Sequence, residues 1–82
     1  MTDLEPRVRA LVSAHLDIDP DRLRPEARLG ADLCIDSLAA IELALVLEDA
    51  FDIALPDEER EDVRTYDDVV QLVRDKVAAN AG

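Results

Sequence analysis

The chain has 82 residues, a length that predicts a single domain over residues 1–82. It carries 9 basic and 20 acidic residues, and the formal net charge of −11 disfavours nucleic acids and anionic membranes while favouring basic protein partners. One cysteine excludes an internal disulfide, and no apolar run suits a membrane span or a signal peptide, so we expect a cytoplasmic protein.

The first helix is predicted at about residues 3–16, because apolar residues recur there at helical spacing. Thr2 and Glu5 have capping-box spacing, and Asp3 is an alternative N-cap. The apolar stripe of this helix consists of Leu4, Val8, Leu11, Val12 and Leu16.

Residues 17–30 are predicted to form a long loop, because they contain two prolines, several charges and a terminal glycine. A short helical turn is expected near residues 21–23. Asp17, Asp19 and Asp21 have the spacing of an EF-hand loop, but the glycine and the final glutamate that such a loop requires are both arginine. These acids are therefore interpreted as turn residues rather than as calcium ligands.

The second helix is predicted at residues 37–51, with Asp36 as its N-cap. Its apolar residues fall on two opposite faces, although a small bundle needs only one buried stripe per helix. The first face consists of Ala40, Leu43, Ala44, Leu47, Ala50 and Phe51. The second consists of Leu38, Ile41 and Leu45, and it is flanked by Glu42, Glu48 and Asp49. One interpretation is a helix buried all round, but the carboxylates favour an exposed docking surface, since buried unpaired acids are costly.

The rest of the chain is predicted to form a break at residues 52–56, a short acidic helix at 57–62 and a final helix that begins at Thr65. Asp68 follows Thr65 by three residues as a capping pair, and residues 78–82 are expected to fray. The sequence therefore predicts an all-α four-helix bundle, with three main helices, one short helix and a long loop between the first two.

Ser37 directly follows the predicted N-cap, Asp36. A group attached to its hydroxyl would lie at the positive end of the helix dipole, beside free backbone N–H groups, and this position suits a phosphodiester. From the spacing alone, a serine that merely begins the helix is the better interpretation, because Asp-Ser-Leu is a weak motif.

The run from Leu29 to Leu38, Leu-Gly-Ala-Asp-Leu-Cys-Ile-Asp-Ser-Leu, resembles the prosthetic-group site of the acyl carrier proteins. The likeness continues through the second helix, through Leu-Pro-Asp-Glu-Glu at residues 55–59 and through the Val69-Val70 helix, so it covers nearly the whole chain. It implies an acyl-carrier-like four-helix bundle that carries acyl chains as thioesters on 4′-phosphopantetheine.

The resemblance also implies roles for individual residues. Ser37 would take the 4′-phosphopantetheine arm from coenzyme A, and Asp36 would help to hold magnesium during transfer by a phosphopantetheinyl transferase. The residues that match the family's partner-docking positions are Leu38, Ile41, Glu42, Leu45, Glu48 and Asp49. The expected partners are that transferase together with acyl transferases, ketosynthases and other synthase enzymes with basic patches.

The chain departs from the family pattern at two places. Cys34-Ile35 stands where the family often has Gly-Ala, and Ala39 stands where an acid is frequent, so the fatty-acid or polyketide pathway stays open. Cys34 is expected to be partly buried and structural, because its acidic surroundings disfavour a thiolate. Asp36 favours an acyl carrier over a peptidyl carrier.

No catalytic activity is predicted, because the chain has a single histidine, His15, and no glycine pattern of a nucleophile elbow. We expect a monomer, with an apolar space beside Leu43, Leu47 and Val63 that could shelter an acyl chain. The alternatives are a peptidyl or D-alanyl carrier and, from another class, an unmodified acidic module that binds a basic protein.

Overall fold

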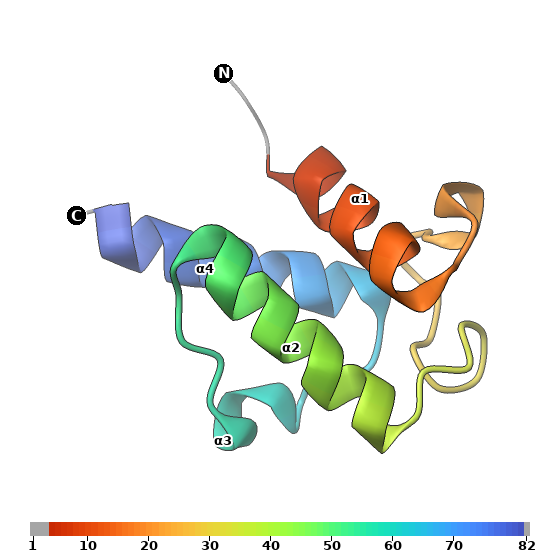
Figure 1. Ribbon diagram of the computed structural model, residues 1–82. Coiled ribbons are helices and arrows are strands. Elements are labelled where there is room, and N and C mark those ends of the chain that lie inside the picture. The colour runs from red at the N-terminus through yellow and green to blue at the C-terminus, as the bar shows by residue number, and fades with distance from the viewer. Residues whose placement is uncertain (1–3, 82) are drawn as a thin grey trace.

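The computed structural model describes residues 4–81, which form four helices and a short 3₁₀ turn (Figure 1). The elements are α1 (Glu5–Leu16), η1 (Pro20–Arg22), α2 (Ser37–Phe51), α3 (Asp57–Arg60) and α4 (Tyr66–Ala81). Helix α2 packs against both α1 and α4, while α3 lies in the connection between α2 and α4. The predicted all-α bundle is confirmed, and α2 has the predicted bounds.

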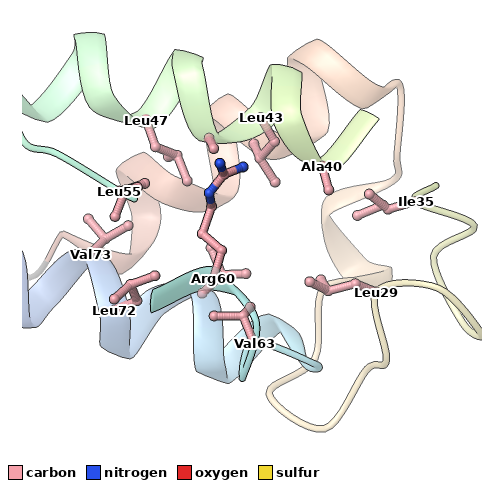
Figure 2. A pocket seen from close by; sticks show the side chains of 12 residues that line it. Leu29, Ile35, Ala40, Leu43, Leu47, Leu55, Arg60, Val63, Leu72 and Val73 are labelled. Atoms are coloured by element: carbon pink, nitrogen blue, oxygen red, sulfur yellow. The ribbon is translucent and has the colours of Figure 1, made fainter. Parts of the chain in front are cut away.

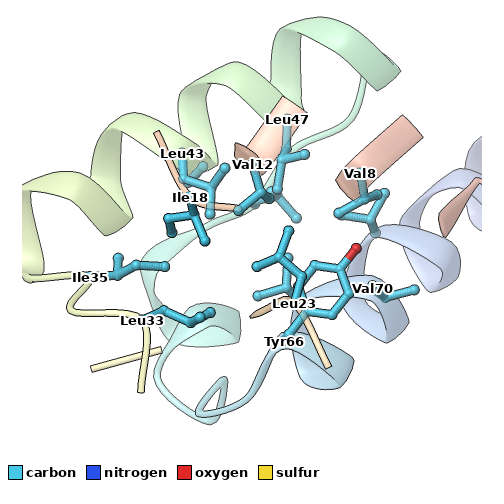
Figure 3. Packing of buried hydrophobic residues seen from close by; sticks show 14 of the residues in the cluster. Val8, Val12, Ile18, Leu23, Leu33, Ile35, Leu43, Leu47, Tyr66 and Val70 are labelled. Atoms are coloured by element: carbon cyan, nitrogen blue, oxygen red, sulfur yellow. The ribbon is translucent and has the colours of Figure 1, made fainter. Parts of the chain in front are cut away.

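The core is built from aliphatic side chains and one tyrosine (Figure 3). The buried residues are Val8, Val12, Ile18, Leu23, Ala27, Leu33, Ile35, Leu43, Ala44, Leu47, Ile53, Leu55, Tyr66, Val69, Val70 and Val73. Tyr66 donates its hydroxyl hydrogen to the Glu5 carboxylate at 2.6 Å, which ties the start of α4 to the start of α1. Burial, followed by the hydrogen bond to Glu5, raises the pKa of the Tyr66 phenol well above its usual range.

The start of α1 differs from the expected capping box. Leu4 is the N-cap and has no side-chain capping bond, and the Glu5 carboxylate accepts from Tyr66 and from Arg9 Nε at 3.0 Å. Thr2 and Asp3, the two predicted caps, lie outside the described residues.

The predicted long loop reaches α2 by pairing with the α3–α4 connection. The Leu29 N–H donates to Arg64 O at 2.9 Å, and the Tyr66 N–H donates to Ala27 O at 2.9 Å. The turn that was expected near residues 21–23 is η1, where the Asp19 carboxylate accepts from the Asp21 N–H at 2.9 Å. These bonds give the buried backbone of the loop its partners and fix the approach to Ser37.

The end of α4 corrects one expectation. Residues 78–82 were predicted to fray, but the helix continues through Ala81, and Gly82 lies outside the described residues. Asn80 Nδ2 donates to Asp52 O at 2.8 Å, so the last turn is tied to the residue that follows α2. Helix α3 is shorter than predicted and ends at Arg60. Within residues 4–81, no helix is long and apolar enough to cross a bilayer.

The predicted capping pair at the start of α4 is confirmed. Asp68 Oδ2 accepts from the backbone N–H groups of Arg64 at 3.0 Å and Thr65 at 3.2 Å, and Thr65 Oγ1 accepts from the Asp68 N–H at 3.2 Å. The bond from the Arg64 N–H is the largest cause of a lowered pKa at Asp68. A carboxylate with a lowered pKa stabilises the fold above its unfolded pKa, and this stabilisation is lost as the pH falls through the folded value.

We therefore predict that Asp68→Ala lowers the free energy of unfolding by about 1 kcal/mol at neutral pH. The loss should shrink in acid, where the wild-type carboxylate becomes protonated. Urea denaturation at neutral and acidic pH measures both effects. Asp67→Ala removes an exposed carboxylate from the same helical turn and is the matched control. Equal losses in the two variants would contradict the capping role.

Candidate functional site

Helix α2 begins at Ser37 because Asp36 caps it. The backbone of Asp36 is extended, with φ −82° and ψ −179°, and its Oδ1 accepts from the Ala39 N–H at 2.8 Å. This geometry is that of an N-cap aspartate, as predicted from the sequence. The capping bond fixes the position of the next residue, Ser37, in the first turn.

Ser37 is exposed, so its hydroxyl is open to solvent. The N–H groups of Ser37 and Leu38 belong to the first turn of α2 and have no acceptor within the helix. The positive end of the α2 dipole also lies there, and the two features together favour an anion. The site therefore fits a phosphate-linked group on the Ser37 oxygen, which would remain outside the core.

The segment before Ser37 alternates between buried and exposed side chains. Leu33 and Ile35 are buried in the core, and the Ile35 N–H donates to Leu29 O at 2.8 Å. Cys34 lies between them and is exposed, so the expectation of a partly buried cysteine was wrong. Its φ of 57° is in the left-handed region, which turns the side chain outward. Glycine, which the resemblance stated above leads us to expect at this position, would suit that backbone conformation.

A groove runs beside Ser37 between the long loop and the α3–α4 connection. Two of its charged residues, Arg28 and Arg64, are cations in a strongly acidic chain. The groove is lined by Arg28, Leu29, Gly30, Ala31, Ile35, Asp36, Ser37, Ala40, Val63, Arg64, Thr65 and Asp68. It gives a group attached to Ser37 a surface along which to lie.

An apolar cavity of about 110 Å³ lies further in, between α2, α3 and α4 (Figure 2). It is lined by Leu29, Ile35, Ala40, Leu43, Ala44, Leu47, Leu55, Arg60, Val63, Val69, Leu72 and Val73. Leu29, Ile35, Ala40 and Val63 also line the groove, so the groove and the cavity adjoin. Leu43, Leu47 and Val63, the predicted walls of an apolar space, are all among the lining residues.

The second apolar face of α2 is exposed, as the sequence predicted. Leu38 is 66% exposed, Ile41 48% and Leu45 60%, and these are the large apolar side chains exposed to solvent within residues 4–81. We call these three residues the α2 strip. It begins one residue after Ser37, so a molecule bound to the strip would lie beside the Ser37 hydroxyl.

The three acids predicted to flank the strip fall into two groups. Glu42 and Asp49 are exposed. Glu48 is half-buried, and its Oε2 accepts from the Leu55 N–H at 2.8 Å. Glu48 therefore stabilises the connection between α2 and α3, whereas the side chains of Glu42 and Asp49 are exposed to solvent.

Sequence reasoning missed the arginines of this region. Arg28 and Arg64 come to the groove only because the loop pairs with the α3–α4 connection, which is a tertiary contact. Arg60 lies in a short, highly charged helix, where a charged residue is normally solvated, yet it lines the apolar cavity. No local pattern marks these positions.

The chain matches the family described as the phosphopantetheine attachment site over residues 6–73. It is 42% identical to an acyl carrier protein of Thermosynechococcus vestitus over 73 residues, 89% of this chain and 90% of that protein. It is 40% identical to an acyl carrier protein of Caulobacter vibrioides over 78 residues, 95% of this chain and all of the relative. An acyl carrier protein of Phenylobacterium zucineum is 38% identical over 79 residues, 96% of this chain and all of the relative.

The backbone of Cys34 generates a prediction about stability. A side chain in the left-handed region costs about 1 kcal/mol that glycine avoids, and β-branched residues fit that region worst. Cys34→Gly should therefore unfold at a higher temperature than Cys34→Val, with Cys34→Ala between them as the control for loss of the thiol. Thermal unfolding followed by circular dichroism measures the order. A Val variant as stable as the Gly variant would contradict the assigned conformation.

Proposed function

Because this chain belongs to the phosphopantetheine-attachment family and is an acyl carrier, we propose that Ser37 is the residue that bears its 4′-phosphopantetheine arm. The observation that carries the proposal is the exposed hydroxyl of Ser37 in the first turn of α2. The chain is a carrier and not a catalyst, so its residues position the arm and present it to enzymes.

The arm supplies a terminal thiol on which acyl groups are held as thioesters. The first turn of α2 favours the phosphodiester through its free N–H groups and its dipole. The groove beside Ser37 is lined by two cations, Arg28 and Arg64, and by two carboxylates, Asp36 and Asp68, so it is less acidic than the rest of the surface. These features hold the anchored end of the arm at the surface of the protein.

Asp36 has two roles in the proposal. Its Oδ1 caps α2 through the Ala39 N–H, and this fixes Ser37 at the helix start. Its exposed carboxylate also offers an oxygen ligand to the magnesium ion that the transferase uses, in agreement with the resemblance. Removal of Asp36 would therefore impair both the helix start and attachment of the arm.

The α2 strip is the proposed docking surface for partner enzymes. Full burial of one Leu or Ile side chain contributes about 2 kcal/mol, so the strip can support binding without making it permanent. Glu42 and Asp49 flank the strip and can pair with basic residues on a partner. Charges at such a rim raise the rate of encounter and select partners more than they raise affinity. Glu48 should contribute less to partner binding, because its carboxylate already accepts a hydrogen bond from the Leu55 N–H.

The cavity between α2, α3 and α4 is the proposed shelter for the acyl chain. It adjoins the groove that begins at Ser37, and apart from Arg60 its lining is apolar. A chain inside it would be protected from water and from enzymes that do not recognise the carrier.

Partners and location stay predictions. We propose a phosphopantetheinyl transferase, acyl transferases and ketosynthases as partners, a cytoplasmic location and a monomeric carrier. Asp36 favours an acyl carrier over a peptidyl one, and the similarity to acyl carrier proteins favours it over a D-alanyl carrier. An unmodified interaction module would not need an exposed serine at the start of α2.

The test of the attachment site is incubation with coenzyme A, magnesium and a broad-specificity phosphopantetheinyl transferase, followed by measurement of intact mass. We expect one phosphopantetheine per chain and none on Ser37→Ala. Ser13→Ala is the matched control, because Ser13 is the other serine of the chain. No addition to the wild type would favour the unmodified interaction module, and addition to Ser37→Ala would place the site elsewhere.

The docking surface generates a kinetic prediction. Glu42→Lys should lower kcat/KM of the same transferase by about tenfold, because it reverses a charge beside the strip and slows encounter. Added salt should lower the wild-type rate more than the variant rate, since it screens an attraction that the variant lacks. Asp75→Lys makes the same charge change at an exposed position on α4 and is the control. Equal rates for the two variants would remove Glu42 from the docking surface.

A further inference from the structure

One ion pair joins the two helices α3 and α4, which both contribute walls to the cavity. Lys76 Nζ on α4 donates to Glu59 Oε1 on α3 at 2.6 Å and lies 2.5 Å from Glu59 Oε2. The neighbouring pair between Arg60 and Asp57 stays within α3, so it cannot connect that helix to another one. The Glu59–Lys76 pair is therefore a direct connection between α3 and α4.

Helix α3 has few other connections to the bundle. Close packing of one helix on another occurs between α1 and α2 and between α2 and α4. The backbone N–H groups of Glu59 and Arg60 donate to Pro56 O, directly before the helix. Among residues 4–81, the hydrogen bond from Lys76 is the one that joins α3 to another helix. The position of α3 should therefore depend strongly on this pair.

The pair is partly shielded from water. The Lys76 side chain is 28% exposed and that of Glu59 is 38% exposed. Glu59 Oε2 is buried and has no hydrogen-bond partner among residues 4–81, so the nearby ammonium balances its charge. Partly buried pairs are screened less than exposed ones, and removal of one partner leaves the other charge uncompensated. Loss of either residue should therefore weaken the attachment of α3 to α4.

The pair lies beyond the end of the cavity that is opposite to the groove. Along α4, Asp68 lines the groove and Val73 lines the cavity. Lys76 follows Val73 by three residues on the same side of the helix, and it lies about 12 Å along the axis from Asp68. On α3, Glu59 directly precedes Arg60, which also lines the cavity. The pair thus joins the two walls at the far end.

An acyl chain that enters from the groove approaches this end as it becomes longer. Each additional methylene is stabilised by burial as long as the cavity has room for it. Beyond that length, the chain has to separate Glu59 from Lys76 or lie against their charges, and both are unfavourable. A short chain ends before the pair and does not meet this cost.

We propose that the Glu59–Lys76 pair limits the length of the acyl chain that the cavity shelters. The inference rests on the proposed function, and it assigns the selection of chain length to a contact between α3 and α4, away from the attachment site at Ser37. Removal of the pair extends the range of chains that the carrier shelters.

The first test uses the unloaded carrier and measures amide hydrogen exchange by NMR. Glu59→Gln and Lys76→Met each remove one partner of the pair. We expect the Glu61 N–H, which donates to Asp57 O, to exchange about threefold faster in both variants, because a four-residue helix is unstable once detached. Glu58→Gln makes the same chemical change at an exposed position of α3 and should leave the rate unchanged. Unchanged exchange in the first two variants would overturn the proposal.

The second test uses carriers loaded by the transferase from butanoyl, octanoyl, dodecanoyl and hexadecanoyl coenzyme A. The readout is the rate at which hydroxylamine cleaves the thioester, since a sheltered chain keeps its thioester close to the protein. We expect equal rates for the butanoyl chain in the wild type and in both variants. The hexadecanoyl chain should be cleaved about threefold more slowly in the variants. Variant-to-wild-type ratios that are the same at every length would overturn the proposal.

A double variant tests whether the two residues act as a pair. Glu59→Gln combined with Lys76→Met should behave like each single variant, because all three lack the same interaction. Effects that add together would show that the residues act separately, and the proposal would be wrong. Failure to load the arm on Ser37 would reject the proposed function, whereas loading without a change in the length limit would reject only this inference.

Discussion

Helix α2 has to satisfy two environments at once, and the rest of the structure depends on this requirement. One face buries Leu43, Ala44 and Leu47 in the core, while the opposite face leaves the α2 strip in water. Exposed apolar side chains gain nothing in the free protein, and this is why we propose the strip as a docking surface. Because both faces belong to one helix, the Ser37 hydroxyl, the strip and the cavity wall keep fixed relative positions.

The placement of Ser37 depends equally on backbone pairing far from it in sequence. The long loop is held by bonds such as Leu29 N–H to Arg64 O, and Asp36 then starts α2 in a defined direction. The same pairing brings the groove to the serine and joins it to the cavity. A serine in an identical local motif, without this loop, would have the helix dipole but no path toward the interior.

Much of the fold could be predicted from the sequence, because helical periodicity and capping residues are local signals. The bounds of α2, the capping pair at Thr65 and Asp68 and the exposure of the α2 strip all follow from such signals. The failures involve tertiary contacts. The last turn of α4 persists through the bond from Asn80 to Asp52, and Cys34 is turned outward by a left-handed backbone between two buried neighbours.

In the candidate site, too, the residues with local signals could be predicted and those placed by tertiary contacts could not. Asp36 and Ser37 could be identified, because capping chemistry and a family motif coincide there. Arg60 could not, since its burial depends on where a four-residue helix packs, and its sequence neighbours are charged. The groove cations were missed for a similar reason: Arg28 and Arg64 are far apart along the chain and meet only through the loop pairing.

The brevity of α3 has a mechanical consequence. This helix has only four residues and no side-chain cap, whereas the facing wall is the 15-residue α2. Segments with few backbone bonds and little buried surface open at the lowest free energy. The cavity therefore has one stiff side and one compliant side, so a bulkier acyl chain would be accommodated by displacement of α3, while the proposed docking surface on α2 would keep its shape.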